Sequence, residues 1–181
     1  QMAVYARSRV GTSICPTTMT IPLDELKCAV QKINELAKTA NAKCSRIIGI
    51  NMEGPFISPA KKGAQKVEDI LKADVKTFHE LNKASGKLIK LVDLAPEMDG
   101  ALEFIDQVKD EVRVSLAHTN ANYDEASSAF ASGAKHVTHL YNAMPSLHHR
   151  EPGVIGAAFD NADVKCELIV DGVHSHPAVV R

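Results

Sequence analysis

VRVSLAHTNANYDEASSAFASGAKHVTH, residues 112–139, joins two short runs rich in β-formers through a stretch with helical spacing. The runs VRVSLA (112–117) and HVTH (136–139) predict strands, and residues 123–132 between them predict a helix. Two strands connected by a helix form a βαβ unit, in which the strands run parallel. This stretch therefore predicts an α/β protein built on a parallel sheet.

The same alternation continues on both sides of this unit. Further strands are predicted at TSIC (12–15), RIIGIN (46–51), KLIKLVDL (87–94) and CELIV (166–170). Helical spacing is found in residues 22–40, 74–84 and 99–110. The chain is thus expected to hold about six βα units.

Polar residues follow the predicted strands at their C-terminal ends. They are Thr17 and Thr18, Glu53, Glu97, His118, His139 and Asp171. A doubly wound sheet concentrates its ligand groups at one switch point, whereas a barrel collects them from many strands. Six polar ends in series favour a partial, TIM-like (β/α)8 barrel. Such barrels typically take about 250 residues, so residues 1–181 are expected to be the central part of one catalytic barrel domain, with the first and last strands missing.

Composition limits the possible partners. The chain has 181 residues, 45% of them hydrophobic, and a formal net charge of -1, so no basic field favours nucleic acid or an anionic membrane. No apolar run approaches the roughly 20 residues of a membrane span. The four cysteines are scattered and no signal peptide is seen, which predicts reduced, buried thiols in a cytoplasmic protein.

Three of the polar strand ends suggest a metal site. His118 ends VSLAH and His139 ends HVTH on consecutive predicted strands, and Glu53 closes IIGINME. Two imidazoles and one carboxylate, with a fourth position left to water, are typical of an open catalytic zinc site. From the residues alone, unrelated polar strand ends remain an equal alternative.

The other histidines receive weaker interpretations. His136 lies three positions before His139 on one strand, so it is predicted to point toward the helical layer as a structural histidine. His148 and His149 are predicted to lie in a solvated loop without a role. His176, beside a proline, is expected to begin a helix after the last strand.

Six motifs carry a resemblance to a known family. CPTTMT, MEGPFISPAKKGAQ, LAPE, AHTNANYDEA, THLYNAMPSLHHREPGVIGA and DGVHSHP follow one another along the chain. In order and spacing they resemble the N-acetylglucosamine-6-phosphate deacetylases of the amidohydrolase superfamily. The resemblance implies that Glu53, His118 and His139 bind a divalent metal. Zinc is expected first, and iron, manganese and cobalt are the alternatives.

The resemblance also implies a substrate and its binding residues. The expected reaction is metal-dependent deacetylation of N-acetylglucosamine 6-phosphate to glucosamine 6-phosphate and acetate. The aminosugar phosphate would be lined by Ala64, Asn142, Ala143, Arg150 and His174. Arg150 would grip the phosphate through its planar fork, and His174 would polarise the acetamide carbonyl. The family further implies a homodimer at full length.

The chain departs from the family pattern in three places. No His-x-His strand precedes Gln1, and the aspartate that serves the family as general acid and base is expected beyond Arg181. The 181 residues alone are therefore predicted to be inactive. Asn51-Met52-Glu53 stands where the family often has His-Leu-Glu. Two alternatives remain: an amidohydrolase acting on another N-acyl sugar or a cyclic amide, and a non-catalytic sugar-phosphate-binding module.

Overall fold

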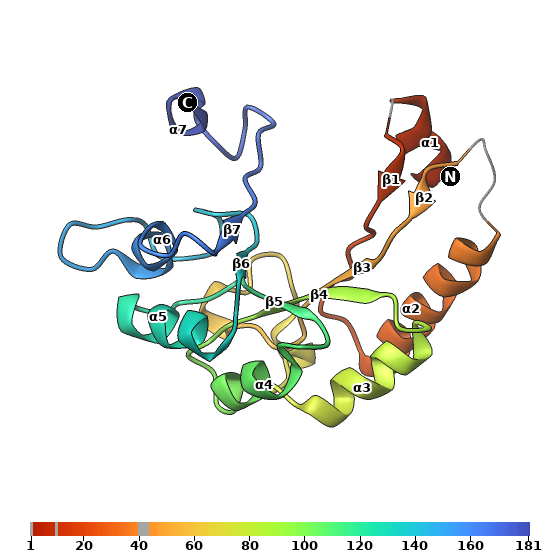
Figure 1. Ribbon diagram of the computed structural model, residues 1–181, viewed down its shortest axis with the longest axis horizontal. Coiled ribbons are helices and arrows are strands. Elements are labelled where there is room, and N and C mark those ends of the chain that lie inside the picture. Colours follow the sequence, from red (N-terminus) through yellow and green to blue (C-terminus); the bar gives the residue numbers. More distant parts are fainter. Residues whose placement is uncertain (1, 10, 40–43) are drawn as a thin grey trace.

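The computed structural model describes residues 2–9, 11–39 and 44–181, in which strands and helices alternate (Figure 1). The strands are β1 (Ser13–Ile14), β2 (Arg46–Ile47), β3 (Ile50–Glu53), β4 (Ile89–Leu94), β5 (Arg113–Leu116), β6 (His136–Val137) and β7 (Lys165–Cys166). The helices are α1 (Met2–Ser8), α2 (Leu23–Lys38), α3 (Val75–Ala84), α4 (Ala101–Val108), α5 (Tyr123–Ser132), α6 (Gly153–Phe159) and α7 (Pro177–Val180).

The strands follow one another across the sheet in chain order. Five of them form a parallel sheet in the order β3-β4-β5-β6-β7, and β1 pairs with β2 in parallel. Thr17, after β1, bridges to Asn51 of β3, which links the two sheets. A doubly wound sheet would reverse its strand order at the switch point. The uninterrupted order confirms the predicted partial barrel.

The sheet is curved, and its two sides differ in chemistry. Helices α2 to α5 cover the convex side, and the concave side opens between the β1–β2 arm and the segment after β7 (Figure 1). Val92, Leu116 and Val137 contribute to the buried core under the helices. At the centre of this core Phe104 packs against two other phenylalanines, with ring centroids 5.2 and 5.9 Å apart. Burial of these rings fixes the sheet against its helices.

The predicted helices are found within a few residues of their expected ends. The helix expected at 22–40 is α2, Leu23–Lys38, and residue 40 lies outside the described residues. Helix α5 begins at a capping box, in which Asn122 and Glu125 each accept a bond from the other's backbone N–H. His176 caps α7 as expected, because its ring accepts from Ala178 N–H. Helices α1 and α6 were not predicted.

The observed strands are shorter than the predicted runs, and two of the runs differ in other ways as well. The run 46–51 is divided into β2 and β3 around Gly49, and the register shifts between Ile50 and Asn51. A Cβ at Gly49 would lie 2.6 Å from Lys90 Cγ, so the backbone approaches β4 too closely for a side chain. Of the run 166–170 only Cys166 lies in a strand, β7, and Val170 is 61% exposed.

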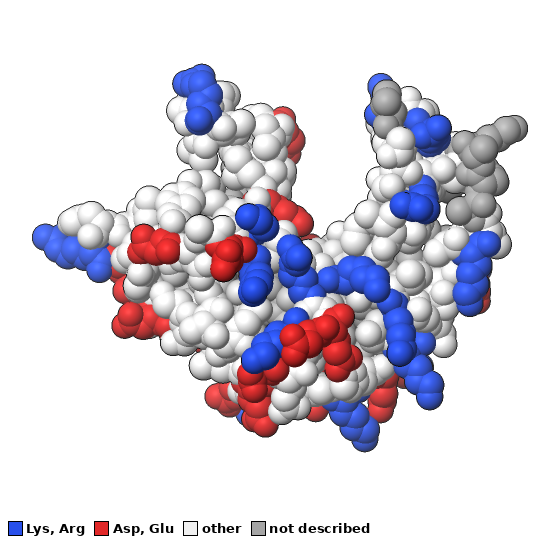
Figure 2. Space-filling view, in the orientation of Figure 1, with Lys and Arg blue, Asp and Glu red and all other residues white. Residues whose placement is uncertain are grey.

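The surface agrees with the charge balance but corrects the prediction for the cysteines. Lysines and arginines lie among acidic residues on the face shown in Figure 2. All four cysteines are free, but Cys15, Cys28 and Cys166 are exposed and Cys44 is only partly buried. The prediction of buried thiols was wrong: Cys28, for example, lies on the outer face of α2, between positions 26 and 30 that face the core. None of the helices in the described ranges has both the length and the apolar character that a membrane span requires.

Candidate metal centre

Three strands bring the candidate ligands to one edge of the sheet. Glu53 is the last residue of β3, and His118 and His139 each follow a strand, β5 and β6, by two residues. Because the strands are parallel, their carboxyl ends meet at the same edge. The prediction that these three side chains converge is confirmed, since their ligand atoms all lie within 4.8 Å of one another.

Both histidines reach the concave side through an unusual backbone conformation. Regular alternation from Ser115 and His136, which lie on the concave side, would turn His118 and His139 toward the helices. Instead His118 has φ of 46° and His139 has φ of 38°, both in the left-handed region. This conformation costs a non-glycine residue roughly 1–2 kcal/mol and is concentrated at functional sites. The two turns redirect both imidazoles into the site.

This geometry corrects the prediction for His136. The residue lies on the concave side together with His139, because the left-handed turn at His139 breaks the alternation on which the prediction depended. Its Nδ1 is 3.0 Å from Ser115 Oγ, and its Nε2 is 3.5 Å from Glu167 Oε1. Burial, aided by the charge of Arg113, lowers the pKa of His136 to about 4. A neutral, hydrogen-bonded histidine results.

The separations within the trio suit a small cation. His118 Nε2 is 2.9 Å from Glu53 Oε1 and 3.2 Å from His139 Nε2, and His139 Nε2 is 3.8 Å from Glu53 Oε1. Ligand atoms held about 2.0–2.2 Å from a tetrahedral ion stand about 3.3–3.6 Å apart. The three separations bracket that value, so the residues fit a divalent metal.

The tautomer of His118 also fits metal binding. Its Nδ1–H donates to the carbonyl oxygen of Lys61 at 2.9 Å, in a short 3₁₀ turn, Pro59–Lys61. Nε2 then faces Glu53 Oε1 and carries either a lone pair or, in the doubly protonated ring, the proton of a hydrogen bond to that carboxylate. Two lone pairs at this separation repel each other unless a proton or a metal ion lies between them. The bond to Lys61 thus fixes which ring nitrogen of His118 faces Glu53.

The charges of the trio are mutually dependent. Burial alone would raise the pKa of Glu53, but hydrogen bonds and charge from His118 and His139 outweigh it and hold that pKa at about 2. Burial alone would lower the pKa of His139, but the adjacent carboxylate of Glu53 raises it overall. His139 Nδ1 is buried and has no partner among the described residues. The site therefore favours positive charge next to an ionised Glu53.

Gln65 belongs to this centre, although no role was predicted for it. It is 3% exposed, and its Oε1 accepts from Thr20 N–H at 2.7 Å. This bond turns Nε2 toward the trio, where it lies 3.4 Å from Glu53 Oε1 and 3.3 Å from His118 Nε2. The only sequence signal was its place at the end of the motif MEGPFISPAKKGAQ.

A buried carboxylate lies beside the trio on the concave side. Asp93 of β4 is fully buried, pairs in register with Glu53, and accepts hydrogen bonds from Asn51 and Thr138. Burial, together with the charge of Glu53, raises the pKa of Asp93 to about 7 in spite of these two bonds. Its position between Val92 and Leu94 in the run KLIKLVDL was the available sequence signal.

Glu97, the last residue of the LAPE motif, holds the segment that follows His118. One carboxylate oxygen accepts from Thr119 Oγ1 and the other from Asn120 N–H, each at 2.6 Å. Thr119 N–H donates in turn to the carbonyl oxygen of Ala143 at 3.1 Å. The loops after β4, β5 and β6 are thereby tied together at the carboxyl edge.

The structure does not gather the five residues that are expected to bind the substrate as closely as it gathers Glu53, His118 and His139. Ala64 is exposed between Gly63, which faces His118, and Gln65. Asn142 and Ala143 follow His139 directly, and the backbone N–H of Asn142 already donates to the carbonyl oxygen of His139 at 2.9 Å. That bond leaves the N–H of Ala143 as the backbone donor for a ligand at this turn.

Arg150 and His174 lie on exposed segments. Arg150 is in the loop before α6, and its backbone N–H donates to His148 Nδ1 at 3.2 Å. His174 Nδ1 donates to Asp171 Oδ2 at 2.7 Å on the segment leading to α7, which extends away from the sheet (Figure 1). Within the described part of the chain, no hydrogen bond or ion pair joins either residue to the metal trio.

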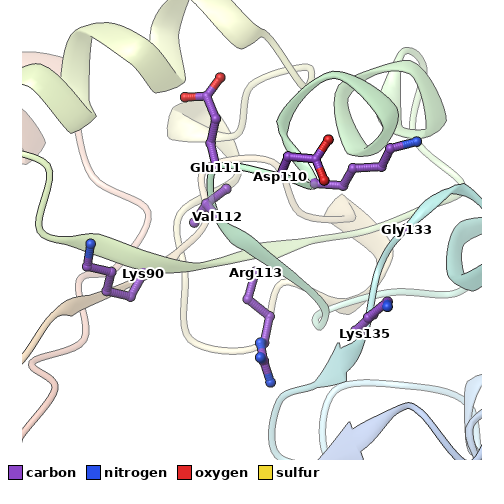
Figure 3. Close-up of a pocket in the computed structure, with 8 residues that line it drawn as sticks. Lys90, Asp110, Glu111, Val112, Arg113, Gly133 and Lys135 are labelled. Carbon is purple, nitrogen blue, oxygen red and sulfur yellow. The ribbon is translucent and has the colours of Figure 1, made fainter.

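A separate cavity of about 430 Å³ lies at the opposite ends of the strands (Figure 3). Lys90, the second residue of β4, and Arg113, the first of β5, line it, and so does Lys135 just before β6. These side chains do not point toward one common centre (Figure 3). Because barrel chemistry takes place at the carboxyl ends, this cavity is not the candidate site.

A curved parallel sheet with helices outside it and an open centre of two histidines and one carboxylate at its carboxyl edge defines a class of protein: the metal-dependent hydrolase barrels. The Amidohydrolase family matches residues 12–181, and the chain belongs to that family.

Relatives of known activity share most of this chain. An N-acetylglucosamine-6-phosphate deacetylase from Bacillus subtilis (strain 168) is 43% identical over 173 residues, covering 94% of this chain and 44% of the relative. An N-acetylgalactosamine-6-phosphate deacetylase from Escherichia coli O157:H7 is 37% identical, covering 97% of this chain and 46% of the relative.

Solved structures show the same fold. Those of N-acetyl-D-glucosamine-6-phosphate deacetylase from Mycobacterium smegmatis superpose with TM-scores of 0.92 for the enzyme and 0.91 for a mutant in complex with N-acetyl-D-glucosamine-6-phosphate. Both are 31% identical to this chain and cover 98% of it and 46% of the other chain. The chain thus spans less than half the length of the relatives it matches.

Proposed function

We propose that this chain is part of a metal-dependent deacetylase that converts N-acetylglucosamine 6-phosphate to glucosamine 6-phosphate and acetate. The observation that carries the proposal is the convergence of Glu53, His118 and His139 at the carboxyl ends of three strands. The 43% identity to a deacetylase of this specificity supports the choice of substrate. Residues 1–181 would form the central part of one catalytic barrel domain.

The metal proposed for the trio is zinc, with iron, manganese or cobalt as alternatives. Two imidazole nitrogens and one carboxylate oxygen are ligands that zinc accepts in catalytic sites. A bound divalent ion lowers the pKa of a coordinated water from 15.7 toward about 7 and polarises a carbonyl group. The chain supplies the ligand geometry, which the left-handed turns and the Lys61 carbonyl hold in place before any metal binds.

Other residues would bind and orient the substrate. Gln65 directs an amide N–H into the centre, where an acetamide oxygen would find a neutral donor. Arg150 and the backbone N–H of Ala143 would hold the phosphate, and the side chain of Asn142 and Ala64 would line the sugar. Asp171 orients the ring of His174 through Nδ1, and the doubly protonated ring would offer its Nε2–H to a substrate carbonyl.

One second candidate has specific support. The relative that is 37% identical acts, by its name, on N-acetylgalactosamine 6-phosphate, which differs from the first substrate only in the configuration at C4. A deacetylase for that epimer would use the same metal trio and the same phosphate contacts. A non-catalytic sugar-phosphate-binding module would instead bind both ligands without turnover.

Acetate release by the full-length, zinc-loaded protein tests the proposal. N-acetylglucosamine 6-phosphate should be the best of three substrates, ahead of its C4 epimer and of unphosphorylated N-acetylglucosamine. Preference for the epimer would select the second candidate. Tight binding of either N-acetylated sugar phosphate without acetate release would instead support the non-catalytic binding module.

The proposal also covers compartment and assembly. The four cysteines are free, as expected in a reducing compartment, and we propose that the protein acts in the cytoplasm. We further propose a homodimer at full length, as in the family that the motifs resemble. Sedimentation velocity on the full-length protein at micromolar concentration tests this assembly.

A further inference from the structure

We propose that Asp93 is a positioning residue that clamps the strand bearing Glu53 to the strand bearing His139 and so sets the spacing of the metal ligands. The inference rests on the metal site proposed above. It assigns a role to a buried group that the deacetylation reaction itself does not use.

The clamp consists of two hydrogen bonds on the concave side of the sheet. Asp93 Oδ2 accepts from Asn51 Nδ2 at 3.1 Å, and Asp93 Oδ1 accepts from Thr138 Oγ1 at 2.7 Å. Asn51 lies two residues before Glu53 in β3, and Thr138 immediately precedes His139. Each oxygen of one carboxylate is thus bound to a neighbour of a different metal ligand.

The direction of the hydrogen bonds requires an acceptor at position 93. Thr138 has one hydroxyl proton and donates it to Asp93, so Ser115 must donate to Thr138 across 2.8 Å. His136 Nδ1 lies 3.0 Å from Ser115 Oγ, at the far end of this chain of contacts. Asn51 and Thr138 both donate to Asp93, which is fully buried and therefore has no water to replace a lost partner.

Asp93 does not serve as a fourth metal ligand. Both of its oxygens are already occupied by donors, and the group of residues able to hold one ion comprises Glu53, His118 and His139. Its effect on the metal must pass through the strands. His139 makes the longest separation in the trio, 3.8 Å from Glu53, and its backbone is in the left-handed region. A clamp between these two strands controls that separation.

The test is zinc affinity, measured by competition with a chromogenic chelator in the full-length protein. Asp93→Ala and Thr138→Val should each weaken zinc binding by about 10- to 100-fold, the range for residues that orient metal ligands. Thr138→Val keeps the side-chain shape, so it serves even where Asp93→Ala fails to fold.

Two further variants make the result specific. Asp93→Asn should stay within about threefold of the wild type, because Asn51 Oδ1 has no partner and Asn51 can turn its amide to accept from the new Nδ2. Ser85→Ala is the matched control for a lost buried polar group. Its hydroxyl is fully buried, accepts from Leu88 N–H at 3.1 Å and lies away from the metal edge. It should lower stability without changing zinc affinity.

The outcomes separate this inference from the proposed function. Unchanged zinc affinity in folded Asp93→Ala and Thr138→Val proteins overturns the clamp and leaves the metal site standing. An equal loss in Asp93→Asn and Asp93→Ala would assign the effect to charge and also overturn the clamp. A wild-type protein that binds no divalent metal overturns both proposals.

Discussion

Replacing Gln65 by glutamate exchanges one nitrogen for one oxygen and adds a negative charge beside the metal ligands. The hydrogen bond from Thr20 N–H to Oε1 is preserved, so the side chain should keep its orientation. The new oxygen takes the place of Nε2, 3.4 Å from Glu53 Oε1. Without a metal, Q65E therefore places two carboxylates side by side in a buried site.

The size of the effect follows from this separation. Two unit charges 3.4 Å apart in an effective dielectric of about 20 repel by about 5 kcal/mol. A carboxyl group can escape this repulsion by taking up a proton, which at pH 7 costs a glutamate of ordinary pKa about 4 kcal/mol. The destabilisation of the metal-free protein is thus limited to about 4 kcal/mol. A divalent ion between the carboxylates reverses the sign of the interaction.

The assay is urea denaturation at pH 7, with chelator and with excess zinc. Q65E should unfold more easily than the wild type in chelator, and the difference should vanish or reverse in zinc. The matched control is Q107E, because Gln107 also donates to a glutamate, Glu103, at 3.1 Å, but on the exposed face of α4. It should cost less than about 0.5 kcal/mol in either condition. An equal loss for Q65E with and without zinc would refute a cation site at this trio.

Four other outcomes are expected. His118→Ala and His139→Ala should each abolish stoichiometric metal binding measured by mass spectrometry of the purified full-length protein; retained metal and activity in both would contradict the ligand assignment. Arg150→Ala should lower kcat/KM for the phosphorylated sugar by about 1.5–3 kcal/mol, roughly 10- to 150-fold, and leave the unphosphorylated sugar unaffected; equal losses would argue against a phosphate contact. His136 has a pKa lowered to about 4 by burial, below its usual 6.5, so its contribution to stability is present above pH 6.5 and is lost as the pH falls toward 4. His136→Gln should therefore reduce the loss of metal-free stability between pH 7 and 4.5 by up to about 3 kcal/mol in urea titrations, and unchanged pH dependence would count against a buried neutral ring. Residues 1–181 expressed alone should release no acetate, because they span less than half of the related enzymes; full activity of that polypeptide would contradict the expectation.

Local signals were sufficient for the order of the elements. Alternating strand and helix patterns predicted the helices at 74–84 and 123–132 within one residue, because capping residues and apolar spacing act over one or two turns. The sequence also showed the motif at 138–157, and it predicted that Glu53, His118 and His139 lie at the ends of strands. Parallel strands must bring such ends to one edge.

The direction of a side chain could not be predicted from the sequence where the backbone departs from regular strand geometry. Alternation placed His136 toward the helices, yet the left-handed φ of His139 puts both residues on the concave side. Residue type alone does not predict that turn, although histidine adopts the left-handed region more often than most residues do. Here Asn142 N–H bonds to the His139 carbonyl, and Ser58 N–H bonds to the His118 carbonyl, each at 2.9 Å.

The sequence by itself determined the α/β class and the meeting of Glu53, His118 and His139 at one edge of the sheet, since both follow from periodicity and from the shared direction of parallel strands. Only the tertiary structure decided that Gln65 faces the metal trio and that Asp93 joins two ligand-bearing strands. The contacts of Asp93 with Asn51 and Thr138, and of Gln65 with His118, link residues 42 to 53 positions apart. Curvature of the sheet brings them together, and curvature is a property of the packed layers that no local stretch of sequence encodes.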